Sequence, residues 1–178
     1  MPNRRVKEPA FSHLDGRGKA RMVDVGEKSE TLREALAVGE AKMTPATVDA
    51  IRRGQVAKGD VLAVARLAGI QGAKQTSALI PLCHPLFLDC VEVGFAFGPD
   101  RVFLRARARV QGRTGVEMEA LVAVTVAALA LYDMCKSADK GMELGPFALV
   151  HKSGGRSGVF ARKRKWGGPP PEEDGAWE

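Results

Sequence analysis

The sequence predicts one α+β domain in which helices cover one face of an antiparallel sheet. Two observations carry this prediction. A stretch with apolar residues at three- and four-residue spacing, typical of a helix, precedes two segments with the two-residue alternation of a β-hairpin. An almost wholly apolar helix follows that hairpin, and another strand follows the helix. No internal repeat is visible.

Two helices are expected in the first half of the chain. Thr44 followed by Pro45 is a typical helix start, and this short helix ends near Gly54. A longer helix begins at Gly59-Asp60 and continues to Leu79-Ile80, because the proline that follows stops it.

The β-hairpin comes next. Its strands are residues 91–97 and 102–110, joined by the turn Gly98-Pro99-Asp100. Alternate residues from Arg105 to Arg109 are arginines, so one face of this hairpin is expected to be wet. The last two elements are a buried helix from Glu119 to about Asp139, whose final turns emerge into solvent, and a strand over Phe147–His151.

Length and charge define the domain organisation. The chain has 178 residues and a net charge of +6, of which residues 1–21 carry +4, residues 162–178 carry zero and the middle carries +2. A near-neutral body argues against a protein that coats nucleic acid. We therefore expect a flexible basic arm over 1–20, a single catalytic domain over 21–161 and a flexible tail over 162–178.

The three cysteines indicate a reducing compartment. They form neither a CxxC pair nor a zinc-ribbon spacing, so we expect free thiols and no metal site. The longest apolar run, Ala120 to Tyr132, is shorter than the roughly 20 residues that cross a bilayer, and no apolar segment follows the basic N-terminus. The expected location is the cytoplasm, with no membrane partner.

The segment from Ile80 to Leu86 is unusual because two prolines bracket Cys83 and His84. The histidine is held on a stiff turn, either as a structural residue or as a proton donor or acceptor. Zinc is disfavoured, since the two adjacent side chains point in different directions and no second pair exists at ligand spacing.

Charged residues cluster near the end of the last long helix. Asp133 and Lys136 are three residues apart, and Lys140 is four further on, so all three lie close to one face. Such spacing is commonly an exposed ion-pair stripe. The alternative is a functional carboxylate–lysine pair with displaced pKa values, because the preceding turns are apolar enough to be buried.

A glycine-rich loop, Lys152 to Gly158, follows the last strand and combines hydroxyls with two cations. Its backbone can approach phosphate oxygens closely. It lacks the order of a Walker A loop, so a plain flexible loop remains an alternative. Lys58 and Lys74 add cations near helix ends.

Seven strings, in order from Met22 to Gly158, resemble those of the cyclic pyranopterin monophosphate synthase (MoaC) family. They are MVDV from Met22, KGDV from Lys58, ARLAGIQGAK from Ala65, LIPLCHPL from Leu79, TGVEMEAL from Thr114, YDMCK from Tyr132 and KSGGRSG from Lys152. The resemblance implies a lyase of molybdenum cofactor biosynthesis, which converts 3′,8-cyclo-7,8-dihydro-GTP to cyclic pyranopterin monophosphate plus diphosphate. It also implies a ferredoxin-like fold and a hexamer, a trimer of dimers, with active sites at a subunit interface.

The resemblance also assigns site residues. By motif, the catalytic residues would be Asp133, Lys136, Lys58, His84 and Lys152. The substrate-binding residues would be Leu82, Cys83, His84, Met118, Glu119, Lys74, Arg33, Glu117, Gly154 and Gly155.

The chemistry fits these residue types. Rebuilding a dihydropurine as a pterin needs proton transfers and no redox step, so positioned acids and bases suffice without a cofactor. Clustered lysines should depress one another's pKa and let one act as a base near neutrality. We expect Lys136, paired with Asp133, to be the main acid or base with Lys58 assisting, while Lys152, Lys74 and the glycine loop hold the triphosphate.

Two rival classes remain. A nucleotide-binding regulator would keep the cavity but lose the chemistry, and a basic RNA-binding protein would need basic residues interleaved with aromatics across one surface. The catalytic motif residues are present and aromatics are sparse, so the sequence favours the enzyme, with no nucleic-acid partner.

Overall fold

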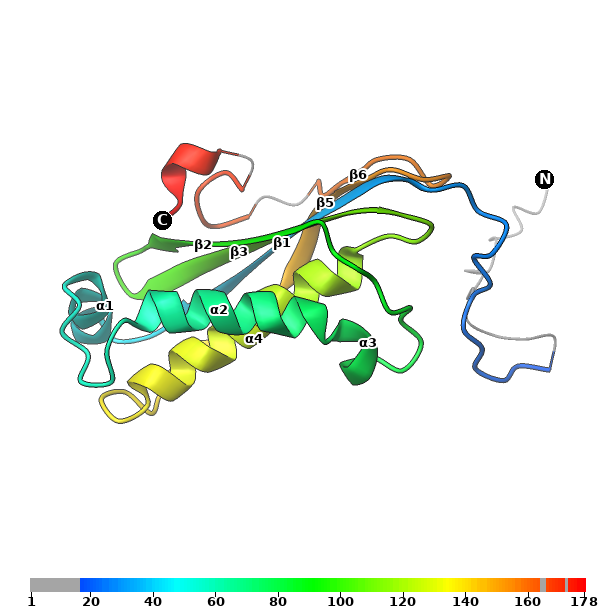
Figure 1. The fold of residues 1–178 in the computed structure, drawn as a ribbon. Coiled ribbons are helices and arrows are strands. Elements are labelled where there is room, and N and C mark those ends of the chain that lie inside the picture. The colour runs from blue at the N-terminus through cyan, green and yellow to red at the C-terminus, as the bar shows by residue number, and fades with distance from the viewer. Residues whose placement is uncertain (1–16, 164–165, 172) are drawn as a thin grey trace, which may run out of the picture.

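The structure is a computed structural model that describes residues 17–163, 166–171 and 173–178. Six strands form one sheet, and the α-helices pack on one of its faces (Figure 1). The strands are β1 Thr31–Lys42, β2 Cys90–Phe97, β3 Arg101–Gly112, β4 Glu143–Leu144, β5 Ala148–Ser153 and β6 Phe160–Ala161. The helices are α1 Pro45–Arg52, α2 Val61–Lys74, α3 Thr76–Leu79, α4 Glu117–Cys135 and the short 3-10 helix η1 Asp174–Ala176.

The sheet is antiparallel, with the strand order β2-β3-β1-β5-β6, and β4 pairs with the end of β1. Along the chain, β1, the helices α1 to α3, the hairpin β2–β3, helix α4 and β5 follow one another. This is the βαββαβ order of ferredoxin-like folds. The predicted α+β sandwich is therefore confirmed.

The capping residues seen in the sequence correctly predicted where two helices begin. Thr44 caps α1 by accepting a hydrogen bond from the Thr47 amide, and Asp60 caps α2 by accepting one from the Ala63 amide at 2.9 Å. The long helix expected from Gly59 to Ile80 is divided in two. The break falls at Gln75, where the Thr76 hydroxyl donates to the Ala73 carbonyl at 2.9 Å.

The central strand β1 was missed, since the sequence analysis assigned no element to residues 31–42. Its sequence is rich in Ala, Leu and Glu, which are good helix formers. Residues 35–39 are buried without interruption, because helices cover one face of the strand while Trp166 packs near Leu36 and Val38 on the other. A strand covered on both faces shows no alternation of apolar and polar residues.

Helix α4 is the core helix of the domain. By length and composition it could cross a membrane, with a mean hydropathy of 1.7 over its most apolar window. It packs instead against the sheet and α2, and Gly69 allows the close contact, because a Cβ there would lie 2.8 Å from the Ala123 carbonyl oxygen. The helix begins at Glu117 and ends at Cys135, slightly earlier at both ends than expected. Its two ends carry the two groups of functional residues described below.

Candidate active site

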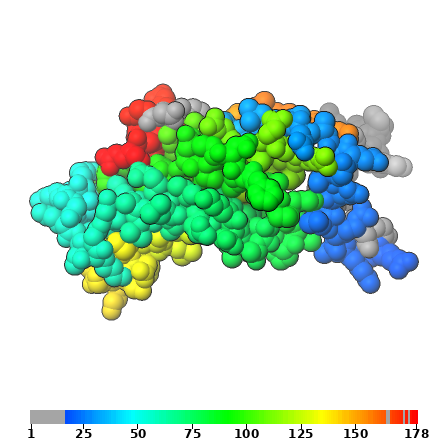
Figure 2. Space-filling model, in the orientation of Figure 1, coloured from blue at the N-terminus to red at the C-terminus, as the bar shows by residue number. Residues whose placement is uncertain are grey.

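A cavity of about 790 Å³ opens at the N-terminal end of α4. The chain from residue 17 to the start of β1, blue in Figures 1 and 2, lies at the same end of the molecule as α3. The cavity is built by the loop after α3, the start of β1, the start of α4 and the loop after β5. Among its lining residues are Thr31, Arg33, Leu82, Cys83, His84, Leu86, Arg113, Glu117, Met118, Glu119, Lys152, Gly154, Gly155, Arg156 and Ser157.

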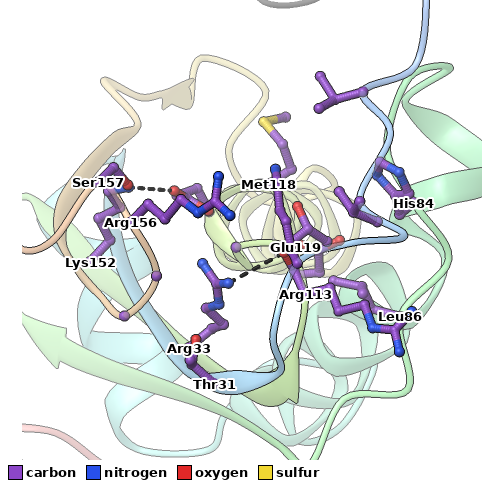
Figure 3. Close-up of a pocket in the computed structure, with 18 of the residues that line it drawn as sticks. Thr31, Arg33, His84, Leu86, Arg113, Met118, Glu119, Lys152, Arg156 and Ser157 are labelled. Carbon is purple, nitrogen blue, oxygen red and sulfur yellow. Dashed lines mark hydrogen bonds and ion pairs between the residues drawn. The ribbon is translucent and has the colours of Figure 1, made fainter.

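Three of the cations that line this cavity lie on one side of it. Figure 3 shows Arg33, Lys152 and Arg156 on one side and His84 on the other, with the start of α4 between them. The guanidinium of Arg33 is fixed by the last residue of β3, because Nε donates to the Gly112 carbonyl at 3.1 Å. Lys152 Nζ lies 3.3 Å from a carboxylate oxygen of Glu117 and also contacts the Ser157 hydroxyl.

The glycine loop packs against Arg33. Gly154 and Gly155 have φ of 90° and 71°, which L side chains rarely adopt. A Cβ on Gly155 would overlap the Arg33 guanidinium, and one on Gly154 would overlap the Leu32 carbonyl. The glycines therefore give the loop both its turn and its close approach to a fixed cation, as an anion-binding loop requires.

The Cys-His segment forms the opposite wall. The Cys83 amide donates to the Ile80 carbonyl at 3.1 Å, which closes a turn that contains Pro81. His84 and Cys83 both line the cavity and are half-buried. Burial raises the pKa of the Cys83 thiol, and the nearby Glu119 raises it further, so the neutral thiol is favoured.

Glu119 is the buried acid of the cavity. It lies in the first turn of α4 and is 4% exposed. Burial raises the pKa of this carboxyl from 4.5 to about 7, and the charge of Glu117 contributes in the same direction. A carboxyl with this pKa can gain or lose a proton at neutral pH, which is what acid–base catalysis requires. The motif resemblance implies only a substrate-binding role for Glu119, because the burial of this side chain is not visible in the motif.

A second cluster lies at the other end of α4. Asp133 accepts from Lys136 Nζ at 2.6 Å and from Lys58 Nζ at 3.3 Å, and Lys58 also donates to the Asp133 carbonyl at 2.7 Å. Both lysines lower the pKa of Asp133, with Lys136 having the larger effect. The hydrogen bond from Lys136 to Asp133 raises the pKa of that lysine. The expected depressed lysine pKa is wrong for Lys136, because its hydrogen bond to the Asp133 carboxylate and the charge of that carboxylate raise the pKa.

The cavity and this cluster are far apart within one chain. Glu119 and Asp133 are separated by fourteen positions along α4, which at 1.5 Å per residue is about 21 Å. The structure thus brings Arg33, His84, Glu119 and Lys152 together but holds Lys58, Asp133 and Lys136 elsewhere. Lys74 ends α2 as an exposed residue outside the cavity lining.

The cavity also contains cations that the sequence analysis did not select. These are Lys28 and Arg113, whereas Arg156 was expected only as one of the two cations of the glycine loop. Arg156 lies inside the quoted glycine loop and Arg113 directly precedes a quoted string, so proximity to a motif was an available signal for both. Lys28 gave no such signal, since only the fold brings the segment before β1 to the cavity.

In the part of the chain that the structure describes, no three His, Cys, Asp or Glu side chains gather as metal ligands. The expectation of a metal-independent reaction stays a prediction. The expected assignments of single residues to catalysis or binding also stay predictions, to which the geometry adds positions and charges.

Fold and site together define a ferredoxin-like α+β protein with a cation-rich cavity at one end of its core helix and a carboxylate–lysine cluster at the other. The chain belongs to the MoaC family, whose family model matches residues 22–155. It is 60% identical over 155 residues to the cyclic pyranopterin monophosphate synthase of Pelotomaculum thermopropionicum, covering 86% of this chain and 91% of that protein.

Two further relatives carry the same name. Cyclic pyranopterin monophosphate synthase 1 of Mycobacterium tuberculosis is 58% identical over 154 residues, covering 86% of this chain and 91% of that protein. The synthase of Novosphingobium aromaticivorans is 57% identical over 150 residues, covering 84% of this chain and 96% of that protein. The resemblance seen in the motifs is thereby confirmed.

Proposed function

We propose that this protein is a cyclic pyranopterin monophosphate synthase of molybdenum cofactor biosynthesis. It converts 3′,8-cyclo-7,8-dihydro-GTP to cyclic pyranopterin monophosphate and diphosphate. The family match supports this, as do relatives of that name at 57–60% identity. The structural observation that carries the proposal is the meeting of three separate motifs, around His84, Glu119 and Lys152, in one cavity of about 790 Å³. Such a volume suits a small-molecule ligand.

The cation-rich side of the cavity is the proposed triphosphate site. Arg33, Lys152 and Arg156 present cationic groups there, and the Gly154-Gly155 turn brings backbone close to the same space. Cations and backbone amides around a leaving diphosphate stabilise the charge that develops as it departs. Lys152 is currently paired with Glu117 at 3.3 Å, and bound phosphate would compete for this lysine.

Ring formation requires proton transfers at the same site. When the cyclic phosphate closes, a hydroxyl oxygen of the substrate bonds to the α-phosphorus and the bond to diphosphate breaks. The hydroxyl proton then needs an acceptor. Glu119 is suited to this role because its pKa of about 7 leaves part of the population ionised at neutral pH.

The role of Lys136 is refined by its environment. Because Asp133 raises the pKa of this lysine, it is fully protonated at neutral pH and is a general acid rather than a base. Lys58 lies on the same carboxylate at 3.3 Å. The cluster can therefore donate a proton to a departing group and neutralise its charge.

The active site is proposed to be shared between two copies of the chain. About 21 Å along α4 separates the cavity from the Asp133 cluster, more than one mononucleotide can bridge. The cluster is exposed, with Asp133 and Lys136 more than half accessible, so it is free to face another subunit. In a two-fold pair, the cavity of each copy meets the cluster of its partner. The expected trimer of dimers supplies such pairs, and the proposed location is the cytoplasm.

Turnover and complementation test this proposal together. Asp133→Asn and Lys152→Ala are each expected to lose nearly all diphosphate and pterin formation from 3′,8-cyclo-7,8-dihydro-GTP under anaerobic conditions. After the two variants are dissociated and reassembled in equal amounts, about one quarter of the sites would combine an intact cavity with an intact cluster. The expected result is about one quarter of wild-type activity.

Lys140→Ala is the matched control, since Lys140 is an exposed lysine in the loop after α4 and the Asp133 ion pairs do not involve it. Activity that stays absent in reassembled mixtures would refute the shared site. Tight substrate binding without any product from the wild-type protein would refute the enzyme and favour the nucleotide-binding regulator.

A further inference from the structure

Strand β2 is an edge strand whose composition favours pairing with other chains. It lies at one end of the strand order, and its eight residues, CVEVGFAF, contain one charge and no proline. Apolar, β-prone segments of this kind pair readily with other chains when their edge is open. The opposite edge strand, β6, has only two residues, and short edge strands are a common protection.

The C-terminal residues close the β2 edge. The Phe95 amide donates to the Glu178 backbone oxygen at 3.2 Å, and the Glu178 amide donates to the Phe95 carbonyl at 2.9 Å. Arg66 on α2 joins both segments, because Nε donates to the Val93 carbonyl at 3.0 Å and a terminal nitrogen donates to the Glu178 backbone oxygen at 2.8 Å. The edge is therefore paired within the chain at Phe95, and the Val93 carbonyl is satisfied by Arg66.

The same residues cover the sheet face that points away from the helices. Figure 1 shows the C-terminal segment, in red, on the side of β2 opposite α2. A Cβ on Gly94 would lie 3.2 Å from the Trp177 Cβ, a tight contact that would push Trp177 slightly away from β2. The guanidinium of Arg105 lies 5.2 Å from the Trp177 ring centre and donates to the Pro171 carbonyl at 2.7 Å.

A second aromatic anchor lies at the start of this segment. Trp166 packs edge-to-face on Phe103 at 5.7 Å and contacts the small cluster of Leu36, Val38 and Val150. The arginine face of the hairpin, expected to be wet, is thus partly covered. Segment 166–178 lies beyond the part of the chain that matches the family model, residues 22–155.

We propose that the described C-terminal residues, 166–171 and 173–178, form an intramolecular cap that keeps the β2 edge from pairing with β2 of a second copy. Two aromatic anchors, a pair of backbone hydrogen bonds and the Arg66 bridge hold the cap in place. Its release opens an unpaired apolar strand edge, and the resulting partner is another copy of this chain. The cap acts independently of the reaction at the cavity.

Two full-length variants test the cap from opposite sides of the contact. Trp177→Ala removes an anchor, and Arg66→Met removes the bridge from α2. The control is Arg52→Met, because Arg52 also stacks on a β2 aromatic, Phe97 at 5.0 Å, but pairs with Asp49. The two readouts are hydrogen exchange at the Phe95 amide and sedimentation velocity over a range of protein concentrations.

In both cap variants, exchange at Phe95 is expected to be about tenfold faster, with concentration-dependent assemblies larger than those of the wild type. The control is expected to match the wild type in both measurements. Excess peptide with the sequence of residues 166–178 should reverse both changes. Unchanged exchange, or faster exchange with unchanged sedimentation, would overturn the proposal.

Discussion

The free energy of unfolding should fall with rising pH in the wild type because of Glu119, and replacing Glu119 by glutamine should remove this fall. The carboxyl is 4% exposed, and burial raises its pKa from 4.5 to about 7. The folded state therefore binds more protons than the unfolded state between these two pH values, so the free energy of unfolding falls as pH rises through this window. At about 1.4 kcal/mol per pH unit, the fall amounts to about 3 kcal/mol, and it is complete near pH 8.

Glutamine has nearly the same shape as glutamate and no charge, so the free energy of unfolding of Glu119→Gln should not fall with pH in this way. The difference in the free energy of unfolding, variant minus wild type, should rise by about 3 kcal/mol between pH 4 and pH 8. Other titrating groups cancel in this difference. Urea denaturation followed by far-UV circular dichroism, without substrate and at one fixed protein concentration, measures it.

Glu143→Gln serves as the control, because Glu143 is exposed on β4. Its difference from the wild type should stay nearly constant across the same pH range. A Glu119→Gln difference that is equally flat would refute the argument, since Glu119 would then be ionised as easily in the folded as in the unfolded chain. The same substitution should abolish the dependence of kcat on a group titrating near pH 7.

Two further predictions concern other parts of the structure. Gly155→Ala should raise the KM for substrate at least about tenfold, because its Cβ would overlap the Arg33 guanidinium. The control is Gly158→Ala: Gly158 has a similar φ but no atom within 4 Å of an added Cβ, so this variant should only lose about 1 kcal/mol of stability. Equal KM values for the two variants would contradict this prediction. Asp139 is 8% exposed and accepts from the Thr44 amide at 2.8 Å and the Gly141 amide at 3.1 Å, which lowers its pKa. Asp139→Asn should lower the free energy of unfolding by about 1–3 kcal/mol at pH 7. In urea denaturation this loss should shrink as pH falls below 3.8, the ordinary pKa of the carboxyl, and through the lower pKa that it has in the folded state. A loss that persists undiminished at low pH would show that the charge of Asp139 does not cause it.

The sequence by itself determined the features whose causes are local. Thr44-Pro45 and Asp60 cap helices through contacts within three residues, and the turn 98–100 joins strands that pair directly with each other. Helix α4 was visible because its middle, from Ala120 to Tyr132, is almost wholly apolar. The motif strings, read in order, also pointed to the family that the comparisons confirmed.

Tertiary structure decided what depends on segments distant in sequence. Strand β1 is central because two layers bury it, and this burial removed the alternation that would have revealed it. The pKa values of charged side chains also depend on residues that are distant in sequence or on packing. The pKa of Lys136 is raised because the Asp133 carboxylate lies in hydrogen-bond contact with it. The pKa of Glu119 depends on the residues that exclude water from it. Spacing along a helix places side chains on a face, but only packing fixes the distances and burial that set their chemistry.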